Sequence, residues 1–126
     1  MQIPSELKFS KDHEWADRRE DHIRIGITDY AQDALGDVVF VDLPSIGTHV
    51  DAGATIGEVE STKSVSEIYA PVAGTIVEVN ADLTSSPESV NQDPYGAGWI
   101  CVIKIDDASS YDTLLDAAAY GELTHH

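Results

Sequence analysis

The sequence predicts a mainly β fold with short flanking helices, including helices at the C-terminus. Three observations support this prediction. Several short runs alternate apolar and polar residues with the period of two that places one face of a strand in a core. Turn-forming residues separate these runs at short intervals. In addition, residues 52–59 (AGATIGEV) recur with one residue removed as residues 73–79 (AGTIVEV), and such a repeat indicates two related structural units.

The first part of the chain predicts a hairpin over residues 7–27. Residues 7–10 alternate and predict a short strand, whereas residues 17–21 predict a charged turn. Residues 22–27 alternate again, with three isoleucines on one face. We expect the strands at 7–10 and 22–27 to pair with each other.

A short helix is expected after this hairpin. Thr28 has the side chain of an N-cap, and residues 29–35 then give about two helical turns. Gly36 is typical of the residue that ends a helix. Residues 37–43 predict a buried strand, which a proline terminates.

The two repeat halves cover about residues 47–63 and 64–80, and they meet at Lys63. A strand-like run lies on either side of this lysine, so the sequence predicts a hairpin with Lys63 at its tip. Residues 80–87 are too polar and broken for a strand. They predict a loop, with one helical turn at residues 86–90.

The last part of the chain predicts a central strand and a helical cover. Residues 99–105 form the strand, and the helical segment covers about residues 109–123. We expect Leu114, Leu115 and Ala118 to cover one end of the sheet. His125 and His126 are assigned no function.

Length and composition indicate one domain that spans residues 1–126. A hydrophobic content of 42% is enough for a single modest core. The net charge is −16, from 7 basic and 23 acidic residues, which argues against nucleic-acid and anionic-membrane partners. No secretory or membrane-spanning segment is recognised, so we expect a cytoplasmic protein of a bacterium-like cell, with a processed organellar form as the alternative.

Few residues offer chemistry of their own. Cys101 is the only cysteine and lies in an apolar run, so we expect a buried side chain and no internal disulfide. His13, His22 and His49 lack the spacing of a metal site, and no nucleotide-binding or hydrolase motif occurs. Any redox chemistry therefore needs sulfur atoms from elsewhere.

Lys63 is the main candidate for a functional residue. It is one of four lysines, and small hydroxyl residues surround it at Ser61, Thr62, Ser64 and Ser66. An accessible lysine at the tip of a hairpin suits covalent attachment of a cofactor arm, although an ordinary surface lysine is the alternative. The two similar halves around Lys63 resemble the biotinyl/lipoyl-type carrier domain. That resemblance implies a flattened barrel-sandwich hybrid of two related halves.

The sequence further resembles the H-protein family of the glycine cleavage system. The resemblance rests on the order and spacing of segments through nearly the whole chain. These segments are His13–Trp15, Gly26–Gln32, Leu35–Pro44, Glu58–Ser64, Tyr69–Gly74, Val79–Asn80, Val90–Trp99 and Leu114–Ala117.

The resemblance implies that Lys63 carries lipoic acid as an amide. The arm is then expected to carry the aminomethyl group of glycine from the pyridoxal-phosphate-dependent glycine decarboxylase (P protein) to the tetrahydrofolate-dependent aminomethyltransferase (T protein). Dihydrolipoyl dehydrogenase (L protein) reoxidises the arm, and lipoate-attaching enzymes are further expected partners. The protein itself would catalyse nothing, and a monomer is expected because a shuttle must expose its arm to several enzymes.

Two carboxylates are candidates for docking the loaded arm. The loaded amine is cationic, so charge-assisted hydrogen bonds would hold it. The resemblance places Glu14 near the arm, and Glu67 is the second candidate. Relatives often have a small polar residue at the position of Asp12, so no role is assigned there. Solvated surface carboxylates are the alternative for all three residues.

Other carrier families differ from this chain around the lysine or in length. Biotin acceptors place Met on both sides of the lysine, where this chain has Thr62 and Ser64. Lipoyl domains of 2-oxoacid dehydrogenase acyltransferases are shorter and lie within larger chains. A lipoyl relay protein, which hands lipoate to other enzymes, and an unmodified interaction module of the same fold remain open.

Overall fold

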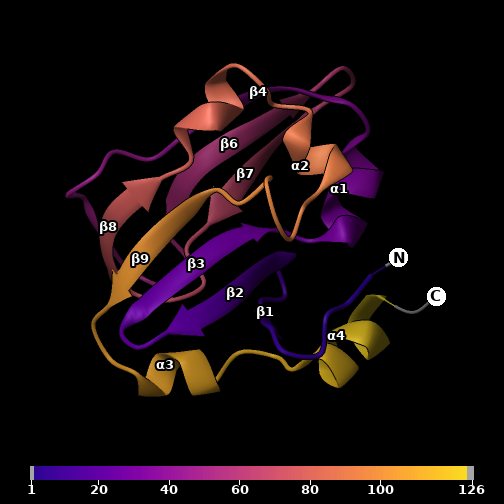
Figure 1. Ribbon diagram of the computed structural model, residues 1–126. Helices are drawn as coiled ribbons and strands as arrows, with labels where there is room; N and C mark the ends of the chain where they lie inside the picture. Colours follow the sequence, from indigo (N-terminus) through magenta and orange to yellow (C-terminus); the bar gives the residue numbers. More distant parts are fainter. Residues whose placement is uncertain (1, 125–126) are drawn as a thin grey trace.

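The computed structural model describes residues 2–124, so His125 and His126 lie outside the described residues. Two antiparallel sheets form the fold (Figure 1). The larger sheet has the order β1 (Lys8–Phe9), β2 (Glu14–Arg19), β3 (His22–Ile27), β9 (Cys101–Ile105), β8 (Gly74–Val79) and β5 (His49–Val50). The smaller sheet has the order β4 (Val38–Asp42), β6 (Thr55–Ser61) and β7 (Val65–Tyr69). The helical segments are α1 (Asp29–Leu35), the 3₁₀ turn η1 (Ala81–Thr84), α2 (Ser89–Gln92), α3 (Ser109–Asp112) and α4 (Ala117–Thr124).

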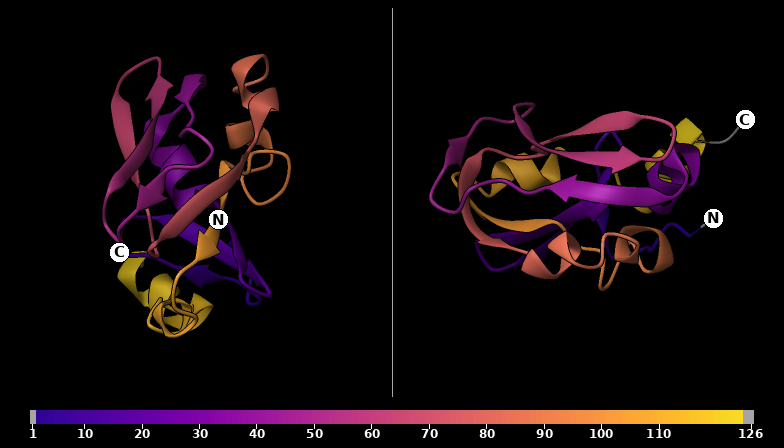
Figure 2. Two further views of the ribbon diagram at one scale, coloured as in Figure 1. Left: turned by 90° about the vertical axis from the view of Figure 1, so that its left-hand side faces the viewer. Right: turned by 90° about the horizontal axis from the view of Figure 1, so that it is seen from above.

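The two sheets form the two layers of a flattened sandwich, seen from its edge in Figure 2. The repeat explains this arrangement, because its first copy lies in β6 and its second copy in β8, on opposite sheets. Apolar side chains of both copies, Val59 and Ile76, are fully buried in the same core. The mainly β sandwich with short helices is therefore confirmed.

The predicted pairing of the N-terminal hairpin is wrong. Strand β3 pairs with β2, and β1 pairs with the other side of β2. The observed turn is shorter than the one predicted at residues 17–21, because Asp17 and Arg19 still belong to β2 and pair with β3. One face of this antiparallel sheet is exposed to solvent, so charged residues are compatible with a strand there.

The helix prediction is confirmed, and the strand after it is only half buried. Thr28 caps α1, since its side chain accepts a hydrogen bond from the backbone N–H of Ala31. In β4, Val41 is buried but Phe40 remains 52% exposed, because the outer face of the small sheet is not covered by any described element. The strand expected at residues 37–43 is present, but the expectation that it is buried is wrong for its exposed residues.

The C-terminal helical segment expected at about residues 109–123 is confirmed as α3 and α4, whereas the helical turn before β9 differs in position from the prediction. One helical turn was expected at residues 86–90. The structure instead has two short segments, η1 before residue 86 and α2 after it. Ala118 is exposed, and Tyr120 is the buried residue of α4, stacked on Phe9 with ring centroids 4.7 Å apart. Leu115 does pair with Phe9 at the edge of the sheet.

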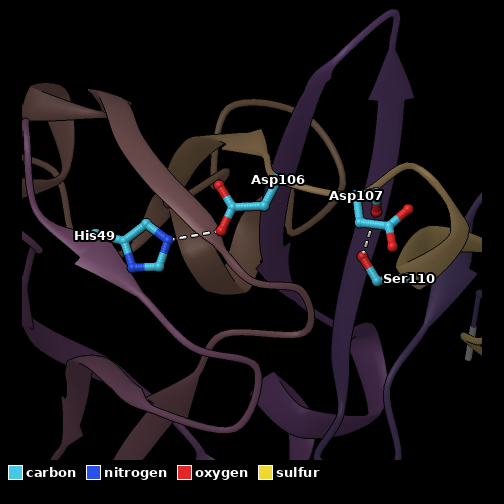
Figure 3. Close-up of polar contacts among 4 residues, drawn as sticks. All are labelled: His49, Asp106, Asp107 and Ser110. Atoms are coloured by element: carbon cyan, nitrogen blue, oxygen red, sulfur yellow. Dashed lines mark hydrogen bonds and ion pairs between the residues drawn. The ribbon is translucent and has the colours of Figure 1, made fainter.

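Polar contacts fasten the end of β9 to neighbouring segments. His49 Nε2 lies 2.6 Å from a carboxylate oxygen of Asp106, which connects β5 with the residue after β9 (Figure 3). The Ser110 hydroxyl donates to the carbonyl oxygen of Asp107 at the start of α3 (Figure 3). Within residues 2–124, no helix is long and apolar enough to cross a membrane.

Candidate functional site: the lysine hairpin and the adjoining cleft

Lys63 lies at the tip of the β6–β7 hairpin, as the sequence predicted, and is exposed. Ser61 closes this tip: its hydroxyl oxygen accepts from the backbone N–H groups of Lys63 (3.3 Å) and Ser64 (3.1 Å). The backbone N–H of Thr62 donates to the carbonyl oxygen of Asp37, 3.1 Å away, at the start of β4. These contacts fix the backbone of the tip and leave the lysine side chain accessible.

The stem of Lys63 passes over Gly36, at the end of α1. A Cβ atom at Gly36 would lie 3.3 Å from Lys63 Cε, and the φ of +81° also favours glycine here. Asn91 holds this corner, because its amide nitrogen donates to the carbonyl oxygen of Gly36 (2.8 Å) and its amide oxygen accepts from the N–H of Val38 (2.8 Å). The lysine therefore rests on a rigid junction between α1 and β4.

A cavity of about 340 Å³ lies between α1, β7 and the loop between β1 and β2. We call it the α1–β7 cleft. One set of lining residues is apolar: Ile27, Ala31, Leu35, Val59 and Ile68. The other set is polar: Asp12, His13, Glu14, Ser66 and Glu67. Ser64, the residue after the lysine, also lines the cleft, so the cavity begins next to the hairpin tip.

Glu14 is a buried carboxyl group on the polar side of this cleft, only 2% exposed. The Ser10 hydroxyl donates to its Oε1 at 2.6 Å, and the backbone N–H of Tyr69 donates to its Oε2 at 3.2 Å. Burial raises the pKa of Glu14 to about 7, although these two hydrogen bonds oppose the change. The surface-carboxylate alternative is thus wrong for Glu14, which bridges β2 and the edge strand β7.

Glu67 and Asp12 line the same cleft but are exposed. A carboxylate oxygen of Glu67 accepts a hydrogen bond from the Tyr69 hydroxyl at 2.8 Å. The structure therefore brings both predicted docking residues, Glu14 and Glu67, to one cavity, together with Asp12, to which the sequence assigned no role.

Sequence reasoning missed several residues of the site. His13 and Asn91 lie within recognised segments, and that position was the available signal for them. Ser10 lies three residues before the first of these segments. Tyr120 had no local signal, because it reaches the site only through the packing of α4. No group of His, Cys, Asp and Glu residues suited to a metal ion occurs in the described part of the chain.

Comparison with known proteins identifies the family of this chain. Residues 7–126 match the family model described as glycine cleavage H-protein. The chain belongs to the glycine cleavage H-protein family. The glycine cleavage system H protein of Mycobacterium tuberculosis strain H37Rv is 58% identical over 130 residues, with 97% of each chain covered. That of Mycobacterium avium strain 104 is 55% identical over 128 residues, again with 97% of each chain covered.

A solved structure supports the same assignment. The crystal structure of a glycine cleavage system H protein from Mycobacterium marinum superimposes with a TM-score of 0.88 at 43% identity, covering 95% of this chain and 97% of that one. The H-protein family serves the glycine cleavage system as its lipoyl carrier, and this is the function of the chain. The match along nearly the whole chain decides against a biotin carrier or an acyltransferase domain.

Proposed function

We propose that Lys63 carries the lipoyl group of this H protein, in amide linkage, and that the protein acts as a non-catalytic carrier. The observation that supports this proposal is the exposed lysine on a closed hairpin tip beside the α1–β7 cleft. When attached, the lipoyl group supplies the dithiol chemistry that this chain lacks, because its single thiol, Cys101, is fully buried. Amide formation also removes the lysine charge at the tip.

The residues of the cleft fit such an arm. Its apolar side, built from α1 and the small sheet, suits an aliphatic chain, and its polar side suits the charged end of a loaded arm. We assign to Glu14 the role of holding the cationic amine, with Glu67 as the outer carboxylate. Because Glu14 has a pKa of about 7, an incoming cation favours its ionised form and displaces its proton to solvent.

The partners follow from membership of the glycine cleavage system. We propose that the hairpin is presented in turn to the glycine decarboxylase, the aminomethyltransferase and the dihydrolipoyl dehydrogenase, and first to a lipoate-attaching enzyme. Tethering then raises the local concentration of the reactive group at each active site. A monomer in the cytoplasm suits this role, since a single exposed tip must reach several enzymes.

Intact mass measurement after incubation with a lipoate ligase, ATP and lipoate tests the attachment site. We expect one lipoyl addition on the wild-type protein and on Lys104→Arg, which alters an exposed lysine on β9 and is the matched control. Lys63→Arg should remain unmodified. Addition to Lys63→Arg would refute the assignment, and no addition to folded wild-type protein would instead indicate an unmodified interaction module.

A further inference from the structure

His13 lies on the wall of the α1–β7 cleft in a fixed and unusual conformation. Its φ of +70° lies in the left-handed region, which residues other than glycine seldom adopt. Its backbone N–H donates to the Ser10 carbonyl (3.2 Å), and its carbonyl accepts from the Thr28 N–H (3.0 Å). Its ring packs on Tyr30 with centroids 4.7 Å apart. The fold therefore holds this ring in place at the cleft.

A chain of hydroxyl groups connects His13 to the interior. His13 Nδ1 lies 2.8 Å from the hydroxyl of Tyr120, which lies 2.7 Å from the hydroxyl of Thr28. The Thr28 oxygen also accepts from the backbone N–H of Ala31 at 3.2 Å. Tyr120 and Thr28 are both fully buried.

The directions of these hydrogen bonds follow from counting donors and acceptors. Within residues 2–124, the only acceptor for the Thr28 hydroxyl proton is the Tyr120 oxygen. Tyr120 has one proton, which must then go to His13 Nδ1. In this arrangement, which satisfies each of these groups, Nδ1 accepts and the ring proton lies on Nε2. A second ring proton at Nδ1 would leave one buried hydroxyl proton without an acceptor, which is costly.

We propose that Tyr120 and Thr28 act as positioning residues that keep His13 neutral, with its proton on Nε2, so that the cleft presents no positive charge to a cationic cargo. This inference rests on the proposed function. The carboxyl groups of Asp12, Glu14 and Glu67 line the same cleft, and the charge of Asp12 raises the pKa of His13. Tyr30 and Tyr120 face the ring from α1 and α4. Burial and the directed hydroxyl chain oppose the carboxyl groups, and burial lowers the pKa of His13 below its ordinary value of 6.5.

Nitrogen-15 NMR of the His13 ring tests the hydroxyl chain on the unmodified protein. We expect the wild-type ring to carry its proton on Nε2 and to titrate below pH 6.5. Tyr120→Phe keeps the ring stacked on Phe9 but removes the hydroxyl. In this variant both tautomers of the His13 ring should be populated, and the pKa of the ring should rise toward 6.5. Thr28→Ser retains the hydroxyl and should behave as wild type. A proton on Nδ1 in the wild type, or an unchanged ring in Tyr120→Phe, would overturn the proposal.

The consequence for the cargo is tested on lipoylated, aminomethyl-loaded protein. Relative to wild type, Tyr120→Phe should release the cargo faster as the pH is lowered through 6.5. The double variant His13→Gln/Tyr120→Phe cannot acquire a charge at residue 13 and should lose this extra acceleration. The electrostatic role would be refuted if the release rate of Tyr120→Phe relative to wild type did not change with pH. It would also be refuted if the acceleration persisted in the double variant. Failure of lipoylation itself would be visible in the intact mass and would leave the NMR result interpretable.

Discussion

Replacing Glu14 by glutamine tests the electrostatics of the α1–β7 cleft most directly. The substitution keeps the size of the side chain and removes the ionisable group. Glutamine has one acceptor oxygen, so it can keep only one of the hydrogen bonds that Ser10 and Tyr69 donate to the two oxygens of Glu14. In the folded protein the pKa of Glu14 is raised from 4.5 to about 7, chiefly by burial. The carboxyl group is therefore neutral in the folded state over a pH range in which it ionises in the unfolded chain.

The sign and size of the effect follow from proton linkage. Below pH 4.5 Glu14 is protonated in both the folded and the unfolded protein, and its contribution to stability is fully present. As the pH rises from 4.5 to about 7, only the unfolded chain loses its proton, so wild-type stability falls relative to Glu14→Gln. A tenfold change in an acid dissociation constant corresponds to about 1.4 kcal/mol, so the total loss is about 3 kcal/mol.

Urea unfolding of both proteins at a series of pH values measures this difference. His13 and the other titrating groups are common to both proteins, so the difference in unfolding free energy isolates Glu14. We expect that difference to shift in favour of Glu14→Gln up to about pH 7 and then to level off. Ser10→Ala removes a hydrogen bond that lowers the Glu14 pKa. In that variant the pH at which the stability difference levels off should therefore be higher. A difference that stays constant from pH 4.5 to above 7 would contradict the reasoning.

Three further predictions concern residues that do not line the α1–β7 cleft. Asn91→Ala removes hydrogen bonds at the corner under Lys63 and should cost about 1–3 kcal/mol, measured by urea unfolding; an unchanged stability would show that water replaces the amide. Cys101 is fully buried, and burial raises its thiol pKa to about 12, so a thiol reagent should react only after unfolding; rapid reaction of the native protein would disprove this. The hydrogen bond to Asp106 raises the pKa of His49. We therefore expect His49→Gln to be less stable than wild type below pH 6.5, and this difference should fade as the pH rises through the raised pKa. Equal losses of stability at acid and alkaline pH would argue against the charged pair.

The elements that the sequence predicted well are those whose local signals agree with their environment. Thr28 and Gly36 bound α1 because capping is a property of a few neighbouring residues. The hairpin around Lys63 was predicted because strand periodicity stops on either side of a polar turn. The pairing of β1 was mispredicted because Asp17 and Arg19 suggested a turn, whereas the exposed end of a strand accepts such residues.

The sequence alone determined the repeated halves, the lysine between them, the single cysteine and the family of the chain. These depend on residue order, which is fully present in the sequence. Only the tertiary structure decided that Glu14 is buried while Glu67 is exposed, and that Tyr120 contacts His13 across 107 residues of sequence. Burial and the pairing of distant polar groups depend on how layers pack. A carboxylate or tyrosine therefore carries no local sign of the proton it will hold in the folded protein.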